Sequence, residues 1–196
     1  MTVVARVVYE DKGGPVHEFG LHKLVVACVA AKLGLEVWQV DRCLDSIPRN
    51  GNGNVVRACR SEARLLCQRG TPLIAVLDED KIRRHVGLAP AACRTEIVAA
   101  IKQGSTAAAL VEVVLLRQNL ETVLECIARV RPSWENVQVA LRKGRHALNE
   151  RDMVLGKAAR DLEVQKRVMD EVPSFARLVD TLANRVKAAY ATPNPA

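Results

Sequence analysis

Four short, mostly apolar segments along the chain have the pattern of β-strands. They are rich in Val, Leu and Ile, and the strongest of them lack the polar alternation of a half-exposed strand. The pattern predicts strands over 3–9, 35–40, 73–77 and 109–116. Helix-length segments alternate with them, an order typical of an α/β fold with an open, mostly parallel sheet flanked by helices.

The segments between these strands carry helix signals. Residues 17–34 form a strongly apolar run that stops at Gly34, a residue type that commonly follows a helix. Asn54 suits the N-cap of a helix over 55–69, whose apolar side chains form one stripe. Two further helices are predicted over 91–103 and 120–130, and a polar loop over 41–54.

Beyond Pro132 the chain becomes charged, helical and strandless. The last helix is expected over 174–190, where Phe175, Leu178 and Leu182 keep a helical spacing. We therefore predict three regions: an α/β core over 1–131, a helical C-terminal extension over 132–190 that packs on this core, and a disordered tail over 191–196.

Composition and charge change this picture only a little. The chain has 196 residues, 49% of them hydrophobic. That is enough for a core without disulfides or a structural metal. Its net charge of +7 suits a polyanionic partner such as DNA or RNA, although many basic proteins have no such partner. Aromatic residues make up only 3% of the chain, which argues against base-stacking platforms for single-stranded RNA.

The cysteines and the apolar runs indicate the compartment. None of the six cysteines forms a C-x-x-C pair, and no Cys/His spacing matches a zinc site. The beginning of the chain has no leader pattern, and no apolar run has the length of a membrane span. We expect a reduced, soluble, cytoplasmic protein that does not associate with membranes.

Acidic residues follow two of the predicted strands directly. The first strand ends on Glu10, and a later one runs into Asp78 and Asp80. Ligands of open α/β sheets collect beyond the carboxyl ends of the strands, and alternate residues of an extended segment face the same way. Carboxylate oxygens are the ligands that Mg²⁺ and Mn²⁺ prefer. This order predicts a divalent-metal site, although acidic residues after a strand can also cap a helix or face solvent.

The two segments that carry these carboxylates, VVYEDKGG and LIAVLDEDK, resemble the strand-end Glu and the Asp-x-Asp motif of the Toprim domain. Topoisomerases, bacterial primases and OLD-family nucleases share that domain. The later VVLLRQNLETVLECIARV and VPSFARLVDTL look like small stand-alone Toprim-like proteins paired with an ATPase in prokaryotic defence loci. The resemblance implies that Glu10 is a metal ligand or general acid/base and that Asp78 and Asp80 hold Mg²⁺ or Mn²⁺.

Other residues near these motifs are candidates for accessory roles. Glu18 and Glu121 match the family's further acidic positions less well, and each is also suited to the first turn of a helix. Asp11 and Lys12 separate Glu10 from Gly13 and Gly14, whereas the family usually has a single glycine directly after its Glu. An inward Lys12 ammonium could replace part of the metal charge. The basic cluster Lys81, Arg83 and Arg84 either contacts a phosphate backbone or forms a solvated helix end.

Three functional hypotheses follow from these motifs. The first is a metal-dependent nuclease or related phosphodiester-cleaving effector acting on DNA or RNA, working beside an ATPase in antiviral defence. The second is a noncatalytic Toprim-like regulatory subunit that docks on such a complex through its helical C-terminal third. The third is an α/β phosphatase or receiver-like domain that uses Asp78. The choice between DNA and RNA and the state of oligomerisation, a homo-oligomer included, stay open.

Overall fold

The computed structural model describes residues 3–10, 20–116, 119–142 and 147–191, with the side chains of Asp80 and Asn119 left undescribed. The chain forms two compact units. The first joins Met1–Lys12 to Arg42–Gln118, and the second joins Gly13–Asp41 to Asn119–Ala196. These units divide the chain at other points than residue 131, and the domain boundary expected there stays a prediction.

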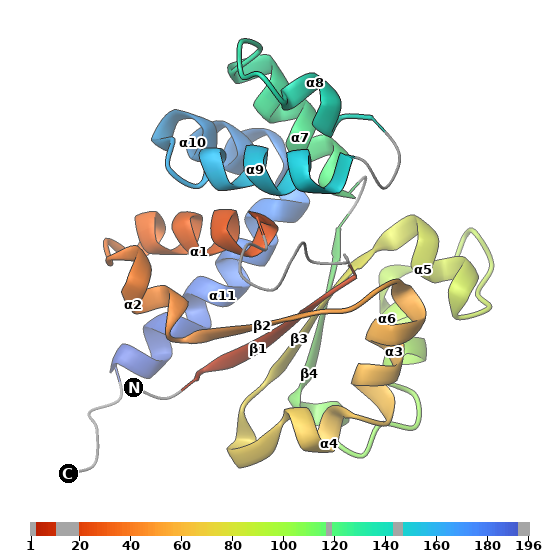
Figure 1. Cartoon of the computed structure of the whole chain (residues 1–196). Coiled ribbons are helices and arrows are strands. Elements are labelled where there is room, and N and C mark those ends of the chain that lie inside the picture. Colours follow the sequence, from red (N-terminus) through yellow and green to blue (C-terminus); the bar gives the residue numbers. More distant parts are fainter. Residues whose placement is uncertain (1–2, 11–19, 117–118, 143–146, 192–196) are drawn as a thin grey trace. The chain divides into compact units, whose positions relative to one another are not determined.

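The described part of the first unit is built on a four-stranded sheet (Figure 1). Its strands are β1 (Ala5–Tyr9), β2 (Leu44–Pro48), β3 (Leu73–Asp78) and β4 (Val111–Leu116). They lie in the order β2-β1-β3-β4, and each neighbouring pair is parallel. The expected α/β class with an open parallel sheet is therefore confirmed. β3 is buried at all of its positions, as its continuous apolar sequence indicates.

The prediction of the second strand was wrong. The segment expected as a strand over 35–40 contains instead a short helix, α2 (Val37–Asp41), which belongs to the second unit. The strand next to β1 is β2, which lies inside the region expected to be a polar loop. β2 is the outermost strand on its side, and it has exposed positions and ends at a proline. An edge strand needs fewer apolar residues than a central one, so its pattern is weak.

Helices of the first unit cover one face of this sheet. They are α3 (Asn52–Arg60), α4 (Ala63–Leu66), α5 (Glu79–His85) and α6 (Arg94–Lys102), with 3₁₀ turns at Gln68–Gly70 and Ala108–Leu110. One core cluster joins strand residues such as Leu73, Ala75 and Leu77 to helix residues such as Ile82 and Ile97. The single helix expected over 55–69 is broken after Arg60, and Asn54 lies inside α3, whose N-cap is Gly51.

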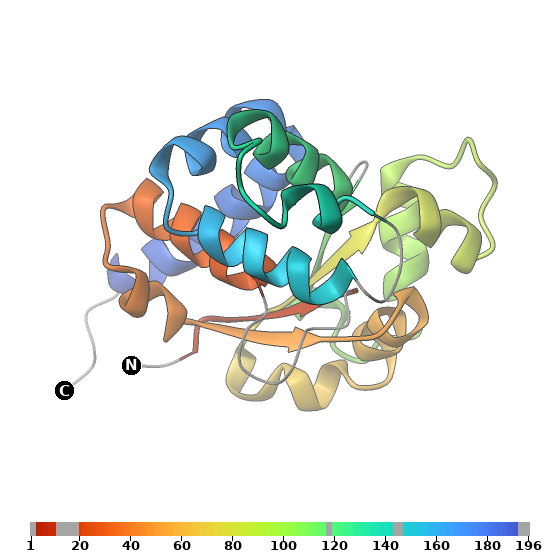
Figure 2. The same ribbon diagram turned by 45° about the horizontal axis from the view of Figure 1, so that its top comes forward.

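The second unit is helical in its described part. It contains α1 (Gly20–Leu33), α2, α7 (Asn119–Val130), α8 (Val137–Ala140), α9 (Leu148–Ala158), α10 (Leu162–Glu171) and α11 (Pro173–Ala191). α1 is buried at most of its positions because α9 and α11 pack against it, and α9 runs beside α1 in both views (Figure 1, Figure 2). Gly34 ends α1 with a φ of 64°, as expected for a residue after a helix.

Ion pairs connect the helices of the second unit. Arg131, which follows α7, pairs with Asp161 at 2.8 Å and with Glu163 at 2.6 Å at the start of α10. Lys32 of α1 pairs with Asp180 of α11 at 2.8 Å. None of the helices in the described ranges has the length and apolar character needed to cross a membrane.

Candidate metal centre at the carboxyl ends of β1 and β3

The strand order places the usual ligand-binding position of an open α/β sheet at the carboxyl ends of β1 and β3. β2 lies on one side of β1, whereas β3 and β4 follow on the other side, so the order reverses between β1 and β3. Open α/β sheets bind ligands beyond the carboxyl ends of their strands at such a reversal. Tyr9 pairs with Val76, which brings the carboxyl ends of β1 and β3 nearly level.

Glu10 and Asp78 occupy this position. The backbone amide of Asp78 donates a hydrogen bond to Oε2 of Glu10 at 3.3 Å. The carboxyl oxygens of an aspartate lie within about 5 Å of its own amide nitrogen, which places the two carboxyl groups within roughly 8 Å of each other. Asp78 is 5% exposed, and Glu10 is half-buried. Two acidic residues that are distant in sequence therefore lie close together, at least partly buried, at the carboxyl ends of β1 and β3.

Backbone hydrogen bonds fix the end of β1. The amide of Arg49, just after β2, donates to the carbonyl of Tyr9 at 2.8 Å, and the amide of Gly51 donates to the carbonyl of Glu10 at 2.9 Å. Gly51 is the N-cap of α3 and has a φ of 85°, a conformation that favours glycine. The turn after β2 therefore holds the backbone of Glu10 beside the beginning of α3.

An ammonium group compensates the buried charge of Asp78. Nζ of Lys81 lies 3.0 Å from Oδ2 of Asp78, and the Lys81 side chain is 52% exposed. Half of the Lys81 side chain lies in solvent, whereas loss of its ammonium would leave the buried carboxylate of Asp78 without a compensating charge unless another cation replaced it. Another cation that competes for the carboxylate can therefore take the place of Lys81.

The geometry expected for Asp78 and Asp80 is corrected by the structure. β3 ends at Asp78 and α5 begins at Glu79, so the two aspartates do not lie in one extended segment. The rule that alternate residues of a strand face the same way does not apply to them. The side chain of Asp80 lies outside the described atoms, and its role as a metal ligand stays a prediction.

Glu79, between the two aspartates, is held by arginines. It is 6% exposed, and its carboxylate accepts hydrogen bonds from Arg83 at 2.6 Å and from Arg94 at 2.6 and 3.0 Å. The sequence motifs do not indicate this cluster, because Arg94 comes 15 residues later and no local pattern connects it to Glu79. Glu79 joins α5 to the beginning of α6 and has a structural role.

The basic residues of α5 divide between its two sides. Arg83 is the partner of Glu79, whereas Lys81, Arg84 and His85 lie at the spacing that shares one helix face. Arg84 and His85 are exposed. The ring of His85 lies against Gly53 in α3, where an added Cβ would come within 3.0 Å of its Cε1. The exposed basic side chains of α5 therefore follow Asp78 closely in the chain.

The remaining accessory candidates are Asp11, Lys12, Glu18 and Glu121. Asp11, Lys12 and Glu18 lie outside the described residues, and Glu121 is a half-buried residue in the first turn of α7 in the second unit. Within the described residues, no group of three or more His, Cys, Asp or Glu side chains is arranged to hold a metal ion. Glu10 and Asp78 supply oxygen ligands of the kind that hard cations prefer, and Mg²⁺ commonly needs only one or two protein carboxylates.

Comparison with known proteins adds no relative to this description. No protein-family model, curated protein or solved structure matches the chain. The resemblance to the Toprim domain therefore depends on the sequence motifs alone.

Proposed function

We propose that the first unit is a divalent-metal-dependent nuclease, or a related phosphodiester-cleaving enzyme, in which Glu10 and Asp78 form the core of the active site. The observation that carries the proposal is the hydrogen bond of 3.3 Å between the Asp78 amide and the Glu10 carboxylate. It supports two adjacent carboxyl groups at the reversal of strand order, where α/β sheets bind ligands.

Each residue near the carboxyl ends of β1 and β3 has a proposed role. Glu10 and Asp78 would hold Mg²⁺ or Mn²⁺, with Asp80 as the further ligand that the Toprim resemblance implies. The metal would stabilise charge on the reacting phosphate and lower the pKa of an attacking water. Glu10 is also suited to accept a proton, because it is half-buried rather than fully enclosed. Lys81 and Arg84, both exposed on α5, would bind backbone phosphates of DNA or RNA.

The wider biological setting follows from the resemblance and belongs to the same proposal. Small stand-alone Toprim-like proteins are paired with an ATPase in prokaryotic defence, and we propose the same arrangement here. The chain would supply the cleaving activity, and the ATPase would be a separate protein.

One observation favours a second function, that of a noncatalytic Toprim-like subunit. Lys81 already neutralises Asp78 at 3.0 Å, and the described residues contain no set of three metal ligands. An ammonium that takes the place of the metal would preserve the fold of the site without its chemistry. In this case the protein would regulate or anchor a partner ATPase and would cleave nothing.

Cleavage of labelled single- and double-stranded DNA and RNA, with Mg²⁺ or Mn²⁺, tests the catalytic proposal. We expect Glu10→Gln and Asp78→Asn each to lower the rate by at least about a hundredfold, because each weakens binding of the metal ion that would stabilise charge on the reacting phosphate. Asp45→Asn is the matched control, since Asp45 is a strand aspartate of the same sheet that pairs with Arg6 at 3.3 Å. Full activity in both site variants would contradict the mechanism.

A further inference from the structure

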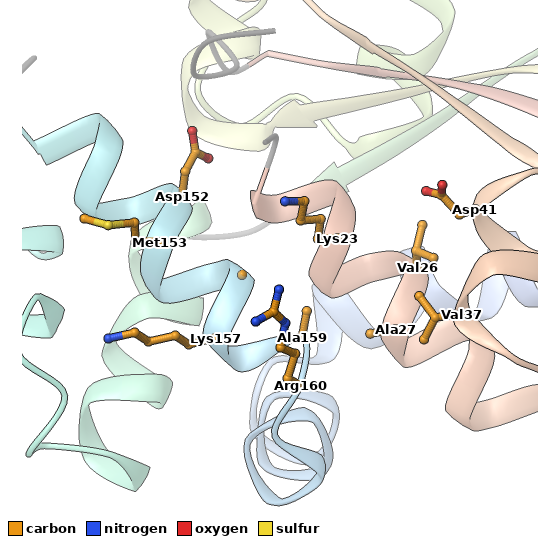
Figure 3. A pocket seen from close by; sticks show the side chains of 11 residues that line it. Lys23, Val26, Ala27, Val37, Asp41, Asp152, Met153, Lys157, Ala159 and Arg160 are labelled. Carbon is orange, nitrogen blue, oxygen red and sulfur yellow. The ribbon is translucent and has the colours of Figure 1, made fainter. Parts of the chain in front are cut away.

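A cavity of about 510 Å³ lies within the second unit, among α1, α2 and the segment from α9 to Arg160 (Figure 3). Its volume is in the range of pockets that bind small organic molecules. Apolar side chains from three helices form much of its lining: Val26 and Ala27 of α1, Val37 of α2 and Met153 of α9. Val37 and Met153 are 51% and 43% exposed, so their apolar side chains are accessible to a ligand.

A glycine in a helix interior is part of the cavity lining. Gly156 lies inside α9 and lines the cavity, and an added Cβ there would meet no atom within 4 Å. Glycine in a helix interior is destabilising relative to alanine. At Gly20 of α1 the absence of a side chain has a packing reason, because an added Cβ would come within 2.6 Å of the Asp152 carbonyl oxygen. Gly156 has no such reason, and any side chain there would occupy the cavity.

The lining of the cavity has a small excess of positive charge. Its lining contains three cations, Lys23, Lys157 and Arg160, and two carboxylates, Asp41 and Asp152. The carboxylates have partners within the unit. Oδ1 of Asp152 accepts a hydrogen bond from the Gly20 amide at 3.0 Å, and Oδ1 of Asp41 lies 4.0 Å from Nε2 of His22.

Two of the cations are available to a ligand. Lys157 and Arg160 are exposed, and neither forms an ion pair with a residue in the described ranges. Figure 3 shows the Arg160 guanidinium between α9 and α1, and Lys157 on the same side of the cavity as Met153. Two cations beside an apolar lining match a molecule that has a negative head and an apolar body.

We propose that this cavity binds a small amphipathic organic anion, such as a carboxylate with a medium-length hydrocarbon chain. The hydrocarbon lies against Val26, Val37 and Met153, and the head group is bound by Lys157 and Arg160. Gly156 leaves the space that the hydrocarbon fills. The site belongs to the second unit and does not depend on the proposed nuclease activity of the first.

Titration with octanoate tests this site, followed by the NMR signals of the Gly156 and Ala159 amides, of which the Ala159 signal also reports binding in Gly156→Leu. We expect saturable shifts of the Gly156 signal, and binding at least about tenfold weaker for octylammonium and octanol, which lack the negative head. Gly156→Leu should abolish binding while keeping the fold and helix content, because leucine is a better helix former than glycine. The double variant Lys157→Gln/Arg160→Gln should weaken octanoate binding about three- to tenfold and leave octanol binding unchanged.

The control has the same change of charge outside the cavity: Lys166→Gln/Arg167→Gln on α10, where both side chains are exposed. It should bind octanoate as the wild type does. Absence of shifts at Gly156 in the wild type, octanoate binding retained in folded Gly156→Leu, or equal binding of octanoate and octylammonium would each overturn the proposal.

Discussion

The amide of Asp78 and the carboxylate of Glu10 are joined by a hydrogen bond of 3.3 Å between residues 68 positions apart in the chain. The bond connects the ends of two neighbouring parallel strands, at the point where the order of strands reverses. Two carboxyl groups in such proximity repel each other unless a cation lies near them. One cation near Asp78 is the ammonium of Lys81, and we propose that a divalent metal ion competes with it.

Lys81→Met tests this competition. We expect the variant to bind Mn²⁺ at least about twofold more tightly than the wild type, because the metal no longer competes with an ammonium 3.0 Å from the Asp78 carboxylate. Isothermal titration calorimetry measures the difference. Arg84→Met removes a cation from the same helix and should leave Mn²⁺ affinity unchanged. Weaker Mn²⁺ binding in Lys81→Met would contradict the competition.

Glu79→Gln tests the assignment of this buried residue to structure rather than to metal binding. Glu79 is 6% exposed and binds both Arg83 and Arg94, so the variant leaves two guanidinium groups without their carboxylate. Loss of one partner from a buried ion pair costs about 3–5 kcal/mol, and the partial exposure of the arginines lowers our expectation to about 2 kcal/mol.

Urea unfolding measures this loss of stability. Glu163→Gln is the matched control, because Glu163 is 63% exposed in its pair with Arg131. That substitution should change stability by less than about 0.5 kcal/mol, as is usual for an exposed pair. Mn²⁺ affinity should be the same in Glu79→Gln and in the wild type. A large loss of Mn²⁺ affinity with unchanged stability would show that Glu79 is a ligand.

The sequence was sufficient for those elements whose local pattern and tertiary surroundings agree. β3 combines continuous burial with a run of apolar residues, and Gly34 ends α1 in the conformation that glycine favours. Leu44–Pro48 is a strand because it pairs with β1, and few of its own residues indicate it. In contrast, α2 contains Val37 and Trp38, which suggest a strand, but both side chains are more than half exposed.

Asp161→Asn tests the ion pair that connects α7 to α10. The hydrogen bond from Arg131 lowers the pKa of Asp161 below its ordinary value of 3.8. A carboxyl whose pKa is lowered by folding stabilises the fold above its unfolded pKa and loses this effect as the pH falls through its folded pKa. We expect the wild type to be more stable than Asp161→Asn at about pH 7, and the difference to shrink as the pH falls below 3.8 through the lowered pKa of Asp161.

Urea unfolding across this pH range checks the prediction. Asp161 accepts hydrogen bonds from the amides of Glu163 and Val164 at 3.1 Å. Asparagine is also a good N-cap residue, so the variant keeps these bonds. The measured difference is then that of the ion pair. A difference in stability that stays constant from neutral to acidic pH would show that the charge of Asp161 does not contribute to the stability of the fold.

The cysteines give a prediction of thiol reactivity. Cys93 is exposed and the other five are buried, and burial raises the pKa of Cys28 and of Cys59 to about 12. Because the thiolate is the reactive form, we expect one fast thiol in the folded protein and six after denaturation. Reaction with Ellman's reagent measures both numbers, and Cys93→Ser should remove the fast thiol. Two or more fast thiols would contradict the described burial.

Part of the candidate site could be predicted from the sequence for a simple reason. Glu10 and Asp78 each follow an apolar strand directly, and the carboxyl ends of parallel strands meet at one edge. The partners of these residues could not be predicted in the same way. The pair of Glu79 with Arg94 depends on where α6 begins, and the pair of Asp78 with Lys81 requires that residues 79–85 be helical rather than extended.

Binding of Mn²⁺, followed by the electron paramagnetic resonance signal of the free ion, tests the central claim most directly. It requires neither a nucleic-acid substrate nor a partner protein. We predict one site in the wild type, an affinity at least about tenfold lower in Glu10→Gln and in Asp78→Asn, and no change in Asp45→Asn. Wild-type affinity in Asp78→Asn, or no binding by the wild type, would contradict a metal centre formed by Glu10 and Asp78.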